Sequence, residues 1–387
     1  MMVPILFWFC VFALFHSYVL YPLILNRLSA AAEKRTVNHP GSGQLPNVAV
    51  ILSVFNERAI LEEKIRSVFS SSYPSSKIEL IIGSDGSTDG SETILASLQK
   101  EFPTLRFAHF TQRIGKGNVL NSLAKMTQAE LLVFTDAKVL FNPDTIPELI
   151  RPFADPSIGL SGGRLVNTRH LPDGISLQEE RFMNREFIMK RQEGELWGTV
   201  AGVYGALYAI RRELLPVIPE NFVVDDFFVT YSVIAMKYKV VMNPSATGIL
   251  NVPNEIREEF RRKARISMGN FQNMVHFSRF LWPPWTGLSF SFLSHKILRW
   301  LGPLFIGGAL ALNVFLVPVH TVYLITLLVQ MLLLIIPGID FVLRKFKIHI
   351  LILRFISHFY GMNLALTAGF INYLKGIKSN VWEPTKR

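Results

Sequence analysis

Apolar residues gather at the two ends of this 387-residue chain, and a segment of mixed polarity lies between them. The first apolar run extends from Val3 to Leu25 and, at roughly 1.5 Å per helical residue, is long enough to cross a hydrocarbon layer about 30 Å thick. Further apolar stretches cover residues 301–317, 321–339 and 348–374. The pattern predicts a membrane protein with one N-terminal transmembrane helix, a middle domain and about three C-terminal membrane segments.

The middle domain alternates short apolar runs with charged segments of helical periodicity. This alternation predicts an α/β domain in which helices cover both faces of a mostly parallel, Rossmann-like sheet. The predicted strands are residues 48–54, 78–82, 105–109 and 130–134, and the predicted helices between them are 57–71, 90–100 and 117–126. Ligands of such sheets bind beyond the carboxyl ends of the strands, so the residues that follow each strand are candidates for a site.

These patterns divide the chain into five regions: a transmembrane helix at 1–27, the α/β domain at 46–255, amphipathic interfacial helices at 256–298, a C-terminal membrane region at 299–375 and a basic tail at 376–387. A cleaved signal peptide is the alternative for the first region, because residues 28–32 resemble a small-residue cleavage site. No basic residue precedes the apolar run, however, whereas Arg27, Lys34 and Arg35 follow it. The positive-inside rule therefore places the middle domain in the cytoplasm.

The formal net charge is +11, and much of the excess lies beside apolar segments. This position favours anionic lipid headgroups as partners and argues against nucleic acid, because the basic residues flank membrane segments instead of forming a groove. The single cysteine, Cys10, lies within the first apolar run, so redox chemistry is not indicated. The basic residues concerned are Arg257, Arg261, Arg262, Lys263, Arg265, Arg344, Lys345, Lys347, Lys375, Lys378, Lys386 and Arg387.

The C-terminal region contains a conflict. Three crossings after the N-terminal one would leave the basic tail on the outer side of the membrane, against the positive-inside rule. Either the last apolar stretch does not simply cross, or the rule fails here. Arg354 and His358 interrupt that stretch, so we expect part of it to lie at the interface or to line a polar path.

Three acidic motifs lie at the ends of predicted strands, and the third is about ninety residues beyond the second. Asp85 lies in the run Gly-Ser-Asp-Gly-Ser-Thr-Asp-Gly, Asp136 follows an apolar strand, and Asp225 and Asp226 are adjacent. Lys116, in a glycine-rich segment, could neutralise a diphosphate. Each motif has an ordinary alternative as a turn or a helix cap. Together they predict one nucleotide site, in which Asp136 could hold a divalent cation that bridges diphosphate oxygens.

In this combination and order, the motifs resemble those of glycosyltransferase family 2, of the membrane-integrated type that includes hyaluronan, cellulose, chitin and poly-N-acetylglucosamine synthases. The resemblance covers roughly residues 48–274. The matching pieces are Asn56-Glu57, Asp85 to Gly90, Gly115 to Asn118, Asp136, Gly205-Ala206 and Asp225-Asp226.

The resemblance implies a GT-A fold, a UDP-sugar donor and a place in the bacterial inner membrane, with the catalytic domain in the cytoplasm. It also implies that Asp85 and Lys116 hold the uridine end of the donor and that Asp136 belongs to the metal and diphosphate site. Asp226, beside Asp225, is the implied catalytic base of an inverting transfer. Asn56, Glu57 and Gly205 complete the implied donor site.

Two residues depart from the pattern of that family. Lys138 places an ammonium where the family's metal motif usually carries its second carboxylate. We still expect a divalent cation, Mg²⁺ or Mn²⁺, held by Asp136 and the donor phosphates, with Lys138 turned outward or contributing charge directly. Of the Gln-x-x-Arg-Trp motif of processive synthases, only Arg265 matches in the stretch from Arg262 to Ile266, although both arginines remain candidate clamps for the diphosphate.

The leading hypothesis is sugar transfer to a growing exopolysaccharide, with secretion-complex subunits as further partners. The missing tryptophan favours an alternative, a single transfer to a lipid-linked acceptor. A catalytically inactive nucleotide-sugar sensor or scaffold is a third reading, supported by Lys138 and opposed by the intact Asp226.

Overall fold

The computed structural model describes residues 2–32, 45–168, 176–250 and 256–377. These residues separate into two compact units. The first, called the α/β unit, comprises described residues within Ser29–Arg169 and Met183–Val252. The second, called the helical unit, comprises those within Met1–Leu28, His170–Phe182 and Pro253–Gly376.

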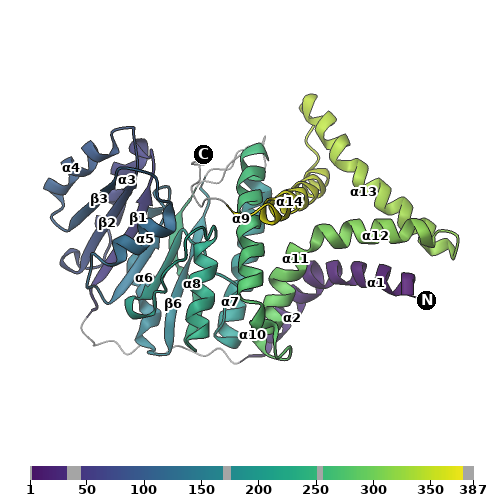
Figure 1. The fold of residues 1–387 in the computed structure, drawn as a ribbon, viewed down its shortest axis with the longest axis horizontal. Helices are drawn as coiled ribbons and strands as arrows, with labels where there is room; N and C mark the ends of the chain where they lie inside the picture. Colours follow the sequence, from purple (N-terminus) through teal and green to yellow (C-terminus); the bar gives the residue numbers. More distant parts are fainter. Residues whose placement is uncertain (1, 33–44, 169–175, 251–255, 378–387) are drawn as a thin grey trace. The chain divides into compact units, whose positions relative to one another are not determined.

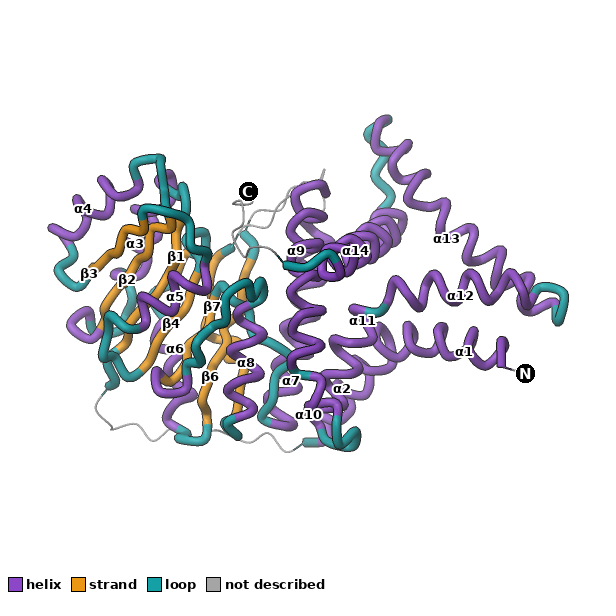
Figure 2. The backbone as a smooth tube through the Cα atoms, viewed as in Figure 1, coloured by secondary structure: helices purple, strands orange, loops and turns teal. Residues whose placement is uncertain are grey.

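The α/β unit is built on one eight-stranded sheet, with strand order β3-β2-β1-β4-β7-β6-β8-β5 (Figures 1 and 2). The strands are β1 Val48–Val54, β2 Ile78–Asp85, β3 Leu105–Phe110, β4 Leu131–Thr135, β5 Leu140–Phe141, β6 Ile158–Val166, β7 Leu207–Arg211 and β8 Lys239–Ile249. The helices are α3 Arg58–Phe69, α4 Ser91–Glu101, α5 Lys116–Ala124, α6 Thr145–Ile150, α7 Ser176–Trp197, whose first turns belong to the helical unit, and α8 Asp225–Ala235.

The sheet is mixed. The predicted parallel arrangement holds for β3, β2, β1 and β4, and β6 is parallel to β8. Strand β7 runs antiparallel to both of its neighbours, β4 and β6, and β5 runs antiparallel to β8. The register of β7 pairs Thr135 with Leu207, so β7 begins at the sheet edge where β4 ends.

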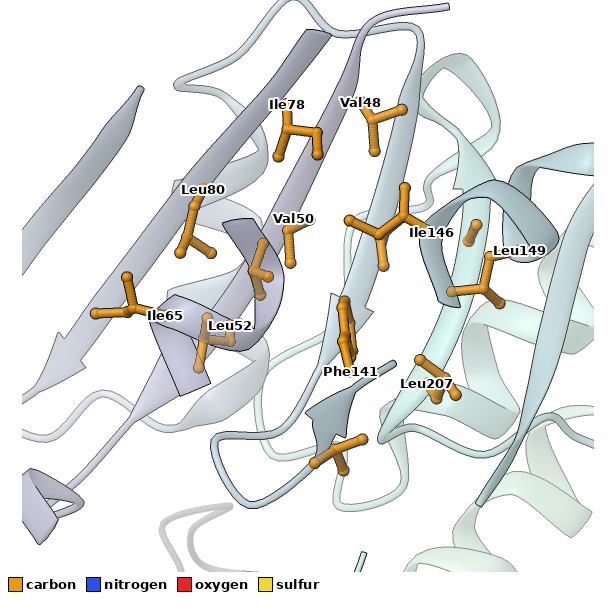
Figure 3. Packing of buried hydrophobic residues seen from close by; sticks show 14 of the residues in the cluster. Val48, Val50, Leu52, Ile65, Ile78, Leu80, Phe141, Ile146, Leu149 and Leu207 are labelled. Atoms are coloured by element: carbon orange, nitrogen blue, oxygen red, sulfur yellow. The ribbon is translucent and has the colours of Figure 1, made fainter. Parts of the chain in front are cut away.

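A continuous apolar core lies between the sheet and helices α3 and α6 (Figure 3). Leu52 and Val50 of β1 pack with Ile65 of α3, and Ile146 and Leu149 of α6 contribute further along the sheet. Strand β1 is buried at every position but one, as expected for a central parallel strand covered on both faces. This packing fixes the ends of β1, β2 and β4, from which the acidic motifs project.

The helical unit contains the apolar ends of the chain. Its helices are α1 Met2–Phe15, α2 Tyr21–Ala31, α9 Ile256–His276, α10 Gly287–Ser291, α11 Leu298–Trp300, α12 Gly302–Leu316, α13 Thr321–Lys345 and α14 Leu351–Leu374. A π-helical turn at His16–Leu20 joins α1 to α2, so residues 2–31 form one continuous helix.

Among the described residues, two helices are long and apolar enough to cross a membrane, Met2–Ala31 and Thr321–Lys345. A third crossing is reached if Gly287–Trp300 and Gly302–Leu316, which meet at 62°, form one broken span. Helix α14 is not among these candidates and packs along α9, where the Ser267 hydroxyl donates to the Leu366 carbonyl at 3.0 Å. Most of the predicted basic tail, from residue 378 onward, lies outside the described residues.

Candidate functional site

The predicted site residues of the α/β unit meet at one edge of the sheet. Asp85 is the last residue of β2, and Asp136 follows β4 directly. Because β7 runs antiparallel to β4, Gly205 precedes β7 at this same edge. The topology thus brings residues from three distant parts of the sequence to the carboxyl end of the parallel strands, where ligands of such sheets bind.

Asp85 is buried and binds the glycine-rich segment that precedes α5. Its Oδ1 accepts the Ile114 N–H at 2.7 Å, and its Oδ2 accepts the Gly115 N–H at 3.2 Å. Gly115 has a φ of 86°, a backbone conformation that favours glycine. The carboxylate of Asp85 therefore fixes the segment from which Lys116 extends.

Lys116 connects the glycine-rich segment with the other acidic motifs. Its Nζ lies 2.8 Å from Oδ1 of Asp136. Burial alone would lower the pKa of Lys116, but the carboxylates of Asp136, Asp225 and Asp226 outweigh burial and raise this pKa above its usual value. Lys116 is therefore a permanent cation held among three carboxylates.

The sequence predicted that Asp225 and Asp226 end a strand. They instead form the first turn of α8. Neither is the N-cap, which is Val224. Asp226 Oδ2 accepts the Gly205 N–H at 2.7 Å, and Oδ1 accepts the Phe227 N–H at 2.8 Å. Burial, followed by the neighbouring Asp225 carboxylate, raises the pKa of Asp226, as expected for two like charges held together.

Asn56 and Glu57 follow β1 at the same edge. Asn56 has a φ of 51°, and its side-chain oxygen accepts the Thr88 N–H at 2.8 Å, so it ties the end of β1 to the Asp85 motif. Glu57 forms an ion pair with Lys138 at 3.3 Å. Lys138 thus has an anionic partner at the N-cap of α3, which compensates the charge of the unusual lysine.

Two residues that the sequence did not single out belong to this cluster. Lys190 of α7 is buried, its Nζ lies 4.0 Å from the centre of the Tyr204 ring, and its charge opposes the rise in the pKa of Asp226. Tyr208 of β7 is fully buried and stacks on Phe134 at 5.0 Å.

The Tyr208 hydroxyl has no hydrogen-bond partner within the described parts of the chain. Burial and the carboxylates of Asp225, Asp226 and Asp136 raise its pKa. Its position three residues after Gly205 offered only a weak sequence signal. Lys190 offered none.

Arg262 and Arg265 belong to the helical unit, and their part in the site remains a prediction. Arg262 donates to Glu259 at 2.7 Å and to Glu179 at 3.0 Å, and both glutamates are buried. Burial would raise the pKa of Glu179, but Lys263, His358 and Arg262 outweigh burial and hold that pKa well below its usual range. In the helical unit Arg262 therefore neutralises buried carboxylates.

The described side chains limit how a divalent cation could be held. Among the described residues, no cluster of three or more His, Cys, Asp or Glu side chains could enclose a metal ion. The Asp136 side chain is 42% exposed, so one of its oxygens could still reach a cation. Mg²⁺ is commonly bound by one or two carboxylates together with substrate phosphates. The residues present are compatible with a cation that arrives with the donor diphosphate.

The mixed α/β sheet, with acidic residues where its parallel strands end, has the GT-A type of fold. A mannosyltransferase, PcManGT of Pyrobaculum calidifontis, solved with GDP-Man and Mn²⁺, has a similar fold: the TM-score is 0.74 at 22% identity, covering 96% of this chain and 99% of that one. Residues 49–218 match the family described as Glycosyl transferase family 2, and this chain carries a glycosyltransferase domain of that family.

Two curated relatives match part of this chain. Poly-β-1,6-N-acetyl-D-glucosamine synthase of Staphylococcus epidermidis is 23% identical over 246 residues, which cover 62% of this chain and 58% of the relative. β-Monoglucosyldiacylglycerol synthase of Nostoc sp. is 29% identical over 119 residues, which cover 30% and 25%. The matched region thus spans less than two thirds of either relative.

Proposed function

We propose that this protein is a membrane-bound inverting glycosyltransferase that transfers a sugar from a UDP-sugar to a growing exopolysaccharide chain, with Asp226 as the catalytic base. The transfer takes place in the cytoplasm at the inner face of a bacterial inner membrane. Secretion-complex subunits and membrane lipids are the proposed partners.

One observation carries the proposal: Lys116 links the three acidic motifs, through contacts to two of them and through charge to the third. Asp85 holds the segment that ends at Lys116, Lys116 contacts Asp136, and its charge is stabilised by Asp225 and Asp226. Lys116 supplies positive charge for a diphosphate where the parallel strands end, and a divalent cation at Asp136 would offset the surrounding carboxylates. A base beside it can act on the acceptor.

Asp226 has the properties that a general base requires. A carboxylate with a raised pKa accepts a proton more readily than an ordinary aspartate. In the proposed step, the acceptor hydroxyl oxygen attacks the anomeric carbon, and Asp226 takes the hydroxyl proton. The bond from that carbon to the diphosphate oxygen breaks, and its electron pair leaves with UDP.

The remaining residues orient Asp226 and the leaving group. The Gly205 and Phe227 N–H groups hold the Asp226 carboxylate in one orientation. Lys116 neutralises negative charge on the departing diphosphate, and Asp85 fixes the segment that carries Lys116. A divalent cation at Asp136, with Lys138 and Glu57 beside it, would add Lewis-acid stabilisation of that leaving group.

A second candidate is a single transfer to a lipid or lipid-linked acceptor. It is favoured by the absence of a tryptophan after Arg265, where this chain has Ile266, and by the similarity to a synthase whose name specifies a glucosyldiacylglycerol product. Both candidates share the donor site and the base. They differ only in the acceptor.

A product assay distinguishes these candidates. The purified full-length protein is supplied with a panel of labelled UDP- and GDP-sugars together with membrane lipids, nucleotide release is followed, and the products are sized. A long polymer supports the synthase, and one added sugar supports the single transfer. Nucleotide binding without release would support an inactive sensor and would refute both enzymatic proposals.

Substitution of the base provides the mechanistic test. Asp226→Asn should lower turnover by about 10² to 10⁴, the range expected for general-base catalysis, while UDP affinity is retained. An Asp226→Asn protein with full turnover would remove this residue from the mechanism.

A further inference from the structure

Helix α3 contains a buried lysine that none of the roles above uses. Leu61, Lys64, Ile65 and Val68 follow the spacing of a buried helical stripe, and all four are fully buried. Three of these positions are apolar, and Lys64 carries an amine into the same core. A buried amine is costly unless its hydrogen-bonding groups are satisfied, so its partners indicate what it does.

The partners of Lys64 lie on the segment that carries Asp136 and Lys138. Its Nζ donates to the Thr135 hydroxyl at 3.1 Å and to the Val139 carbonyl. The same Nζ lies 3.7 Å from the centre of the Phe141 ring. Lys64 therefore contacts this segment immediately before Asp136 and immediately after Lys138.

Two further residues hold the same segment, one at the N-cap of α3 and one within α3. Glu57, the N-cap, forms the 3.3 Å ion pair with Lys138. Ser67, one turn beyond Lys64, accepts the Phe141 N–H at 3.2 Å. Residues 135–141 are thus attached to one helix at both ends and in the middle.

We propose that Lys64 is a positioning residue for the donor site, which holds the segment 135–141 so that Asp136 and Lys138 face the diphosphate of the nucleotide sugar. The inference rests on the proposed function. Lys64 does not touch the donor. It acts through Thr135 and Val139, in the way that outer residues orient metal ligands in other proteins.

The test compares Lys64→Met with a control on the same helix. Methionine fills a similar volume without hydrogen bonds to Thr135 or Val139. The control is Ile65→Val or Ile65→Ala, whichever shows the loss of melting temperature closest to that of Lys64→Met. Ile65 is equally buried, but its apolar side chain makes no hydrogen bond to the segment.

Two measurements are made on the full-length proteins: the dissociation constant for UDP and for GDP with Mn²⁺, and amide hydrogen exchange of residues 136–141. Lys64→Met should weaken nucleotide binding by about tenfold to a hundredfold, the usual effect of removing an outer-shell partner, and should speed exchange in this segment. The Ile65 control should do neither. Equal effects in the two variants, or unchanged binding and exchange in Lys64→Met, would overturn the proposal.

A milder variant keeps the test decisive if Lys64→Met does not fold. Thr135→Val removes one acceptor of the Lys64 amine and should weaken nucleotide binding by a smaller factor, whereas unchanged binding would contradict the proposal. If the wild-type protein binds neither nucleotide, the proposed function fails. Hydrogen exchange then decides whether Lys64 orders the segment.

Discussion

A methyl group added at Gly205 would press directly on the proposed base. The Cβ of Gly205→Ala would lie 2.9 Å from Oδ2 of Asp226 and 3.1 Å from its Cβ and Cγ. Ordinary van der Waals contact begins at 3.4 Å, so the carboxylate would have to retreat by about 0.5 Å in a closely packed site. The Gly205 N–H to Oδ2 hydrogen bond of 2.7 Å would lengthen with it.

The expected consequence is a loss of kcat. A misplacement of about 1 Å in a catalytic group can cost about a hundredfold, so half of that displacement corresponds to about tenfold. Tenfold in rate equals about 1.4 kcal/mol of activation free energy. Lys116 and Asp85, which belong to the proposed donor site, are not displaced, so the donor KM should change little.

Steady-state kinetics at varied donor concentration would measure both constants. Gly162→Ala is the matched control, because its added carbon would lie 2.5 Å from Sδ of Met242 in the core, and a flexible thioether can move aside. We expect Gly162→Ala to lower stability without changing kcat. An unchanged kcat in Gly205→Ala would refute the assignment of Asp226, and a rise in donor KM alone would place Gly205 at the donor instead.

Three further predictions concern charge. Asp225→Asn removes the like charge that helps raise the pKa of Asp226, so the base should stay ionised to lower pH. The acid limb of the pH–rate profile should therefore move to lower pH. An unmoved limb would show that another group controls it. Lys116→Met removes the cation proposed to neutralise the donor diphosphate and should raise the donor KM about tenfold, measured by nucleotide release, whereas an unchanged KM would exclude Lys116 from diphosphate binding. Exhaustive EDTA treatment should abolish turnover and Mn²⁺ should restore it; full turnover after chelation would remove the metal from the mechanism.

The elements between residues 48 and 135 could be predicted from the sequence because each strand there is a short apolar run bounded by turn residues. The observed strands and helices begin and end within a few residues of those expected. Strand β8 could not be predicted in this way. Its sequence, Lys239 to Ile249, contains asparagine, proline, serine and glycine, and it forms a strand because β6 provides a partner distant in the sequence.

The candidate site was predictable only in part, for a similar reason. Asp85, Asp136 and Asp226 carry recognisable motifs, so their types and order were sufficient to select them. The pairing of Lys138 with Glu57 and the burial of Lys190 depend on which faces of α3 and α7 pack inward. Local sequence does not specify such long-range contacts.

The antiparallel course of β7 has a consequence for how such sequences can diverge. Alternate residues of a strand face opposite sides, and each residue advances it by about 3.3 Å. One inserted or deleted residue between Gly205 and Arg211 would therefore turn Tyr208 away from Phe134 or separate Gly205 from Asp226. Relatives should tolerate many replacements in this strand but few changes in its length.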